Sequence, residues 1–184
     1  MTALETALDA DRLRQFLIDS GVPVAGDLHI DLISGGKSNL TFAVTDGSSR
    51  WVVRRPPTGG LTPSAHDMGR EWAVTSALQD TAVPVAETVA FDADGSAIGA
   101  PCTVVGFIDG TVVRTAADLE AYSDADVAAN IDALVRTLAD LHAVDYRAVG
   151  LGEFGRPAGF AARQVKLWAR QWGCLLYTSP SPRD

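Results

Sequence analysis

The chain has 184 residues, of which 47% are hydrophobic and 21% charged, and its formal net charge is −8. This length and apolar content suffice for a packed core and for one domain or one and a half, so an unfolded chain is disfavoured. The acidic balance argues against a nucleic-acid partner, because neutralising phosphates requires clustered lysine and arginine side chains.

Residues 1–27 predict a helix and a lead-in to the first domain. Large apolar side chains recur at roughly helical spacing over residues 4–20, and Gly21 and Pro23 end the pattern. The first residues are acidic where a secretory signal would be basic, and no apolar run approaches the ~20 residues that span a bilayer. We therefore expect a cytoplasmic protein with no membrane partner.

Five short β-type runs within residues 28–108 predict one antiparallel sheet, because the first connections are too short for parallel pairing. The runs cover residues 28–33, 40–44, 50–54, 85–91 and 101–108. In the third run, the alternation of side chains places Val52 and Arg54 on one face and Trp51 on the other.

A helix predicted after the third run carries a carboxylate in an unfavourable place. Ser64 is a suitable N-cap with Asp67 three residues later, and the helix should continue to about Asp80. Glu71 lies on or beside the buried stripe, so a cation should meet it, and Arg54 is the expected partner. A surface pair without function is the alternative. The predicted stripe is Met68, Trp72, Thr75 and Leu78, and the competing cations are Arg55 and Arg70.

The glycine hairpin between the first two runs is a candidate phosphate-binding loop. Gly35 and Gly36 allow close approach of the backbone to a phosphate, and Ser38 and Asn39 add hydrogen-bond donors. The end of this stretch also imitates a P-loop, in which Lys37 would bind the phosphates. The P-loop lacks its first glycine here and is followed by a β-type run where a helix is needed. A simple hairpin turn is the remaining alternative.

The last run leads into a region, residues 109–173, with helical character. Exposed backbone groups at Gly106 and Ile108 could bind an adenine edge, although the end of a strand would look the same. From Ser123 onward, apolar residues follow the i, i+3, i+4, i+7 pattern of a long helix. Without covering helices, this apolar stripe should be exposed and promote aggregation.

Residues 151–163 are glycine-rich and loop-like, and residues 164–173 begin another helix pattern. The tail, residues 174–184, interrupts this pattern. It resembles a translated sequencing adapter, although a natural Ser/Pro tail is possible. We expect a non-native tail and a protein that continues beyond Gly173.

Taken in order, these features resemble a protein-kinase-like N-lobe leading into a C-lobe. Over residues 30–173 the chain resembles the aminoglycoside phosphotransferase and choline-kinase-like family. Residues 35–42, 52–57 and 63–71 resemble the subgroup that includes kinase regions fused to acyl-CoA dehydrogenases. The resemblance implies an α+β fold, with a five-stranded antiparallel sheet and one helix followed by the first helices of an incomplete helical C-lobe.

The resemblance also implies an ATP site. Arg54 takes the place usually held by a phosphate-binding lysine, Glu71 is its helix partner, and Gly106 and Ile108 supply the hinge backbone. Arginine keeps the charge and can bind phosphate through two donors, but its side chain is longer and less compact.

The family's His-Gly-Asp loop, which orients the acceptor hydroxyl, and its later magnesium-binding aspartate are absent from this sequence. We therefore expect the N-terminal portion of an ATP-dependent kinase that phosphorylates a hydroxyl of a small metabolite or an aminoglycoside-like acceptor. The portion should be inactive as given, with Mg²⁺ required by the full-length protein. A pseudokinase-like nucleotide-binding module is the alternative.

Overall fold

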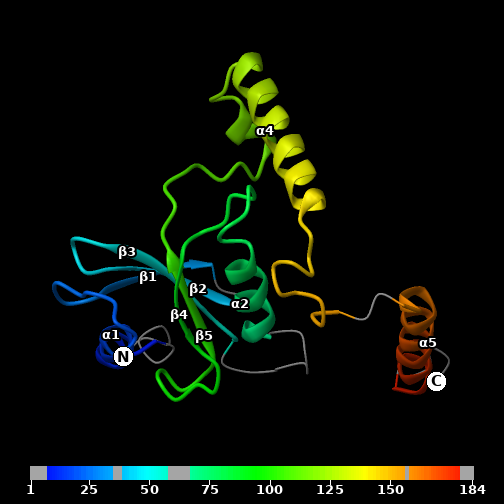
Figure 1. The fold of residues 1–184 in the computed structure, drawn as a ribbon, viewed down its shortest axis with the longest axis horizontal. Coiled ribbons are helices and arrows are strands. Elements are labelled where there is room, and N and C mark those ends of the chain that lie inside the picture. Colours follow the sequence, from blue (N-terminus) through cyan, green and yellow to red (C-terminus); the bar gives the residue numbers. More distant parts are fainter. Residues whose placement is uncertain (1–7, 35–38, 58–66, 156–157, 179–184) are drawn as a thin grey trace, which may run out of the picture.

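The computed structural model describes residues 8–34, 39–57, 67–155 and 158–178. Over these residues, one antiparallel sheet with two helices forms an N-terminal unit, and three further helices follow it (Figure 1). The predicted α+β class is confirmed.

The sheet has five antiparallel strands in the spatial order β1-β2-β3-β5-β4. The first three strands form a meander, and β5 pairs with β3, so the second hairpin adds to the edge of the first three strands. The strands are β1 (His29–Ser34), β2 (Leu40–Thr45), β3 (Arg50–Arg55), β4 (Thr88–Asp92) and β5 (Cys102–Gly106).

Alternation along β3 separates its two faces as predicted. Trp51, Val53 and Arg55 are buried, whereas Val52 and Arg54 are half-buried. The buried face contributes to one apolar core together with neighbouring strands and the first helix. The core comprises Leu8, Leu13, Leu17, Phe42, Val44, Trp51, Val53, Ala90, Ile98, Cys102 and Val104.

Helix α1 (Ala10–Asp19) covers one side of this core. It begins later than the apolar pattern predicted, because the Asp9 side chain accepts a hydrogen bond from the backbone N–H of Arg12, 3.0 Å away, and so caps the helix. Leu13 and Leu17 are fully buried. The lead-in helix is therefore an integral part of the N-terminal unit.

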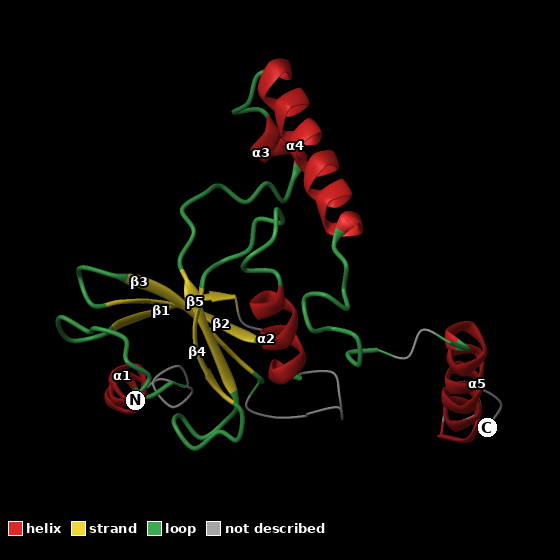
Figure 2. Ribbon diagram, in the orientation of Figure 1, coloured by secondary structure: helices red, strands yellow, loops and turns green. Residues whose placement is uncertain are grey.

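Helix α2 (Met68–Ala77) lies between β3 and β4 in the sequence and packs on the sheet (Figure 2). Its N-cap is Asp67, whose side chain accepts a backbone N–H of the first turn. The predicted cap, Ser64, lies outside the described residues, and the helix ends three residues before Asp80. The Trp72 ring stacks on Phe91 of β4 with centroids 5.4 Å apart, which fixes the helix against the sheet.

Three helices make up the C-terminal part: α3 (Ala116–Leu119), α4 (Asp124–Ala143) and α5 (Phe160–Thr178). Helix α4 starts where predicted, because Ser123 and Asp126 form a capping box. Helix α5 begins earlier than predicted and continues past Cys174, so the predicted helix break there is wrong. None of the helices in the described residues has the length and apolar content to cross a membrane.

Helix α4 exposes the apolar stripe that the sequence predicted. The exposed fractions run from 44% to 68% at Leu141, Leu138, Ile131, Val135 and Leu134. No residue of this helix is buried against the described part of the chain. The aggregation expected from such a stripe stays a prediction.

Asp46 organises the turn between β2 and β3 and ties it to the lead-in segment. One carboxylate oxygen accepts the backbone N–H of Ala25 at 2.7 Å, and the other accepts those of Ser49 at 2.6 Å and Ser48 at 2.9 Å. The side chain is buried, with 8% of the residue exposed. These hydrogen bonds, chiefly the one from Ala25, hold the pKa of Asp46 well below its usual range.

Replacing Asp46 by asparagine is therefore expected to lower the melting temperature at neutral pH by several degrees and to flatten its acid dependence. A carboxylate whose pKa is depressed in the folded state stabilises the fold above its unfolded pKa, near 3.9, and loses that stabilisation as the pH falls further. Circular dichroism melts between pH 3 and pH 7 would test this, with exposed Asp27→Asn as the control. Identical melting profiles for the two variants would contradict it.

Candidate functional site

Arg54 and Glu71 form an ion pair across the interface between β3 and α2. Arg54 Nη1 lies 2.9 Å from Glu71 Oε1, and the two side chains are 36% and 29% exposed. The ion pair expected from the sequence is therefore present. It is partly screened from water, unlike an ordinary surface pair.

The two competing cations are occupied elsewhere. Arg55 points to the opposite face of β3, where it is 8% exposed, and burial lowers the pKa of its guanidinium. Its Nε donates to the carbonyl of Pro56 at 3.3 Å. Arg70 donates to the carbonyl of Phe154 at 3.0 Å. Of the three candidate cations, Arg54 is therefore the one that pairs with Glu71.

Both members of the pair stand on well-supported elements. Arg54 is paired with Thr41 of β2 on one side and Thr103 of β5 on the other, so its backbone lies in the interior of the sheet. Glu71 lies in the first turn of α2, where a negative charge is favoured by the helix dipole. Their separation is therefore governed by how α2 packs on the sheet.

The Arg54 guanidinium retains hydrogen-bonding capacity. Its Nε is buried and has no hydrogen-bond partner among the described residues. A buried donor without an acceptor is unfavourable by roughly 1–3 kcal/mol. The Arg54 side chain as a whole is 36% exposed, so a phosphate, which suits the planar guanidinium, would bind through donors other than this buried Nε.

The predicted glycine loop is attached at the same end of the sheet as Arg54. Gly35, Gly36 and Ser38 lie outside the described residues. Asn39 is half-buried immediately before β2. Because Leu40 and Thr41 of β2 pair with Arg55 and Arg54 of β3, the loop joins the sheet next to the Arg54 end of β3.

The predicted hinge is only partly free to bind a ligand. The Gly106 N–H donates to the carbonyl of Glu87 at 2.8 Å, and the Phe107 N–H donates to the carbonyl of Arg50 at 3.1 Å. Neither amide can donate to an adenine without breaking these bonds. Ile108, the other predicted hinge residue, is 67% exposed.

Arg50 is a hinge contact that sequence reasoning missed. Its guanidinium lies over the Phe107 ring, 4.6 Å from the centroid, and forms an ion pair with Asp109. This pair raises the pKa of Arg50. Arg50 and Arg54 share the less buried face of β3, about 13 Å apart along an extended strand. Strand β3 thus carries both Arg50, which contacts the hinge, and Arg54, which pairs with Glu71.

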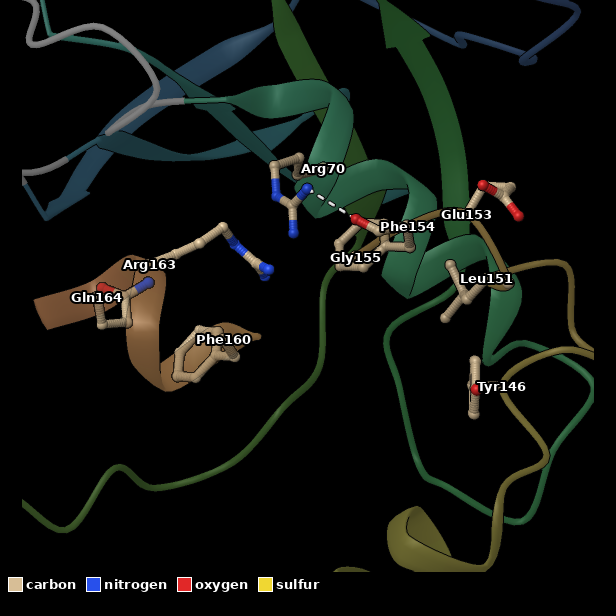
Figure 3. A pocket seen from close by; sticks show the side chains of 10 residues that line it. Arg70, Tyr146, Leu151, Glu153, Phe154, Gly155, Phe160, Arg163 and Gln164 are labelled. Carbon is tan, nitrogen blue, oxygen red and sulfur yellow. Dashed lines mark hydrogen bonds between the residues drawn. The ribbon is translucent and has the colours of Figure 1, made fainter. Parts of the chain in front are cut away.

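A separate cavity of about 760 Å³ opens between α2, the loop before α5 and the start of α5 (Figure 3). Its lining includes Arg70, Tyr146, Phe154, Phe160 and Arg163, but neither member of the ion pair. No three His, Cys, Asp or Glu side chains gather into a possible metal site in the described part of the chain.

Residues 29–177 match the sequence pattern described as the phosphotransferase enzyme family. The chain belongs to this phosphotransferase family. The predicted resemblance is therefore confirmed, and the match extends past Gly173 into the region predicted as a tail.

Curated relatives carry this region as part of longer proteins. Acyl-CoA dehydrogenase family member 11 from Gallus gallus is 36% identical over 84% of this chain and 20% of its own length. The protein of the same name from Rattus norvegicus is 34% identical over 94% of this chain and 22% of its own length. The phosphotransferase-family chain thus spans about a fifth of these relatives.

A solved structure shares the fold. The crystal structure of a candidate aminoglycoside phosphotransferase from Ralstonia eutropha JMP134 matches with a TM-score of 0.72 and 32% sequence identity. The match covers 95% of this chain and 49% of that one. The phosphotransferase-family chain therefore has a kinase-like N-lobe followed by a few helices.

Proposed function

We propose that this chain is the nucleotide-binding part of an ATP-dependent kinase that transfers a phosphoryl group to a hydroxyl of a small molecule. The observation that carries the proposal is the 2.9 Å pair between Arg54 and Glu71, placed at the sheet–helix interface of a phosphotransferase-family fold. A carboxylate that orients a cation toward bound phosphates is a recurring element of kinase sites.

Different parts of the site would bind different parts of ATP. Arg54 would bind the phosphates with the donors that its pair with Glu71 leaves, and the loop at Gly35 and Gly36 would add backbone N–H groups. The backbone of Ile108 would form a hydrogen bond with the adenine edge at the hinge. Val52 lies between the two ends on the same face of β3 as Arg54, where it could contact the base.

The acceptor and the metal are assigned to no residue of this chain. No three His, Cys, Asp or Glu side chains gather among the described residues, and the family's His-Gly-Asp loop and later magnesium-binding aspartate are absent from this sequence. Because phosphoryl transfer depends on a positioned acceptor and on charge stabilisation by the metal, we propose that the chain as given binds ATP without turning it over.

The names of the relatives support a proposal for the acceptor class. One relative is named as an acyl-CoA dehydrogenase family member and another as a candidate aminoglycoside phosphotransferase. Both are compatible with a small hydroxyl-bearing acceptor. We favour a hydroxyacyl-type metabolite over an antibiotic, because the dehydrogenase relatives match at up to 36% identity.

Titration of the 184-residue chain with a fluorescent ATP analogue is expected to show saturable binding that unlabelled ATP reverses. The affinity should be weak, with a dissociation constant of roughly 0.1–1 mM, because much of a complete site is not contained in this chain. A coupled assay should detect no ATP hydrolysis above background. Absence of saturable binding would overturn the proposal.

A further inference from the structure

Arg70 joins the N-terminal unit to the helical part at the start of α2. Its Nη1 donates to the carbonyl of Phe154 at 3.0 Å, and its guanidinium lies over the Phe154 ring, 3.9 Å from the centroid (Figure 3). The two residues are 84 positions apart. The contact combines a charge-assisted hydrogen bond with a cation–π contact, so it defines both distance and orientation.

Both ends of α2 contact the N-terminal unit, but only the N-terminal end also contacts the helical part. Near the C-terminal end, the Gln79 side chain donates to the carbonyl of Ala86 at 2.9 Å and accepts the N–H of Thr88 at 3.3 Å. Those partners belong to the N-terminal unit. At the N-terminal end, the Asp67 cap is local to the helix, and Arg70 reaches the helical part. The first turn is thus held from two sides: Met68 is buried and Glu71 pairs with Arg54 of β3, whereas Arg70 contacts the loop before α5.

That same turn carries Glu71. Consecutive residues on an α-helix project about 100° apart, so Arg70 and Glu71 point to different neighbours: Arg70 to the loop and Glu71 to β3. A shift of the first turn that lengthens the contact to Phe154 also moves the carboxylate relative to Arg54. The contact with Phe154 further keeps Arg70 from competing with Arg54 for Glu71.

We infer that Arg70 is a positioning residue, whose clamp on Phe154 couples the loop before α5 to the Arg54–Glu71 pair and thereby sets nucleotide affinity. This inference depends on the proposed function. It gives the helical part a direct influence on nucleotide binding through one side chain of α2.

The test compares Arg70→Ala, Arg70→Lys and Phe154→Leu in the full chain by two measurements. Hydrogen exchange without nucleotide should show faster exchange in the first turn of α2 for Arg70→Ala and little change in the strands. The dissociation constant of the fluorescent ATP analogue should rise by about 10-fold, which is a typical size for coupling between sites. Arg70→Lys and Phe154→Leu should show intermediate effects.

Two controls separate positioning from general destabilisation. Arg147 lies over the Tyr146 ring, 5.5 Å from its centroid, in the same loop region, so Arg147→Ala removes a similar contact that does not involve α2. It should leave nucleotide affinity unchanged. In a Glu71→Gln background, Arg70→Ala should cause no further loss of affinity, because its effect acts through Glu71.

The outcomes are distinguishable. If the unmodified chain binds no nucleotide, the proposed function fails and this inference fails with it. If the unmodified chain binds nucleotide and Arg70→Ala binds it equally well, only the positioning role is overturned. The same holds if Arg70→Ala weakens nucleotide binding by the same factor in the Glu71→Gln background as in the unmodified chain. Unchanged exchange in α2 would also overturn it, since the clamp would then not hold the helix.

Discussion

Replacing Arg54 by alanine is expected to weaken ATP binding by about 10- to 100-fold, because hydrogen bonds to charged groups contribute roughly 1.5–3 kcal/mol each. The change removes the cation proposed to meet the phosphates and leaves Glu71 without the partner that lies 2.9 Å away. Titration with the fluorescent ATP analogue measures the effect. Glu71→Gln should cause a smaller loss, since the cation remains.

Arg136→Ala is the matched control for Arg54→Ala. Arg136 pairs with Asp132 at 3.0 Å on α4, but both side chains are at least 70% exposed. Removing this surface pair should leave ATP affinity unchanged. Arg54→Lys should retain most binding, because a lysine usually stands here in the family that the sequence resembles. Loss of binding in Lys37→Ala with normal binding in Arg54→Ala would instead favour a P-loop.

Replacing Leu17 by alanine is expected to lower the free energy of unfolding by about 2–5 kcal/mol, because it opens a cavity at a fully buried position. Leu17 belongs to the core that α1 shares with the sheet. The melting temperature should fall by about 5–15 °C. Urea unfolding followed by circular dichroism measures the change in free energy.

The adjacent Ile18→Ala is the control for Leu17→Ala. Ile18 is 40% exposed on the same helix, so its truncation should have a much smaller effect on stability. Leu17→Met nearly conserves volume and should cost less than about 1.5 kcal/mol, which keeps the comparison measurable if the alanine variant does not fold. Equal losses in Leu17→Ala and Ile18→Ala would show that α1 is not part of the core.

Sequence patterns predicted the elements well where a single local rule applied. The alternation along β3 placed Arg54 on the less buried face, and the apolar periodicity from Ser123 onward located the start of α4, where the structure has a capping box. The start of α2 was less well determined, because both Ser64 and Asp67 are good caps and the structure uses Asp67. Local rules do not rank two acceptable caps that stand three residues apart.

The contacts that sequence reasoning missed join residues that are far apart in the chain. Arg50 meets Asp109 across 59 positions, and Arg70 meets Phe154 across 84. Nothing in the spacing of these residues signals their proximity. The hinge shows the same limit, since the use of the Gly106 N–H by Glu87 depends on the path of the chain before β4.

The sequence by itself determined the family, the order of the five strands and the main helices along the chain, and the residue types present at the candidate site. These properties follow from side-chain periodicity, turn chemistry and caps, which act over a few residues. Only the tertiary structure decided which cation meets Glu71, which hinge amide is already occupied and what holds the first turn of α2. Those outcomes depend on the packing of separate elements, where a shift of about one ångström makes or breaks a hydrogen bond.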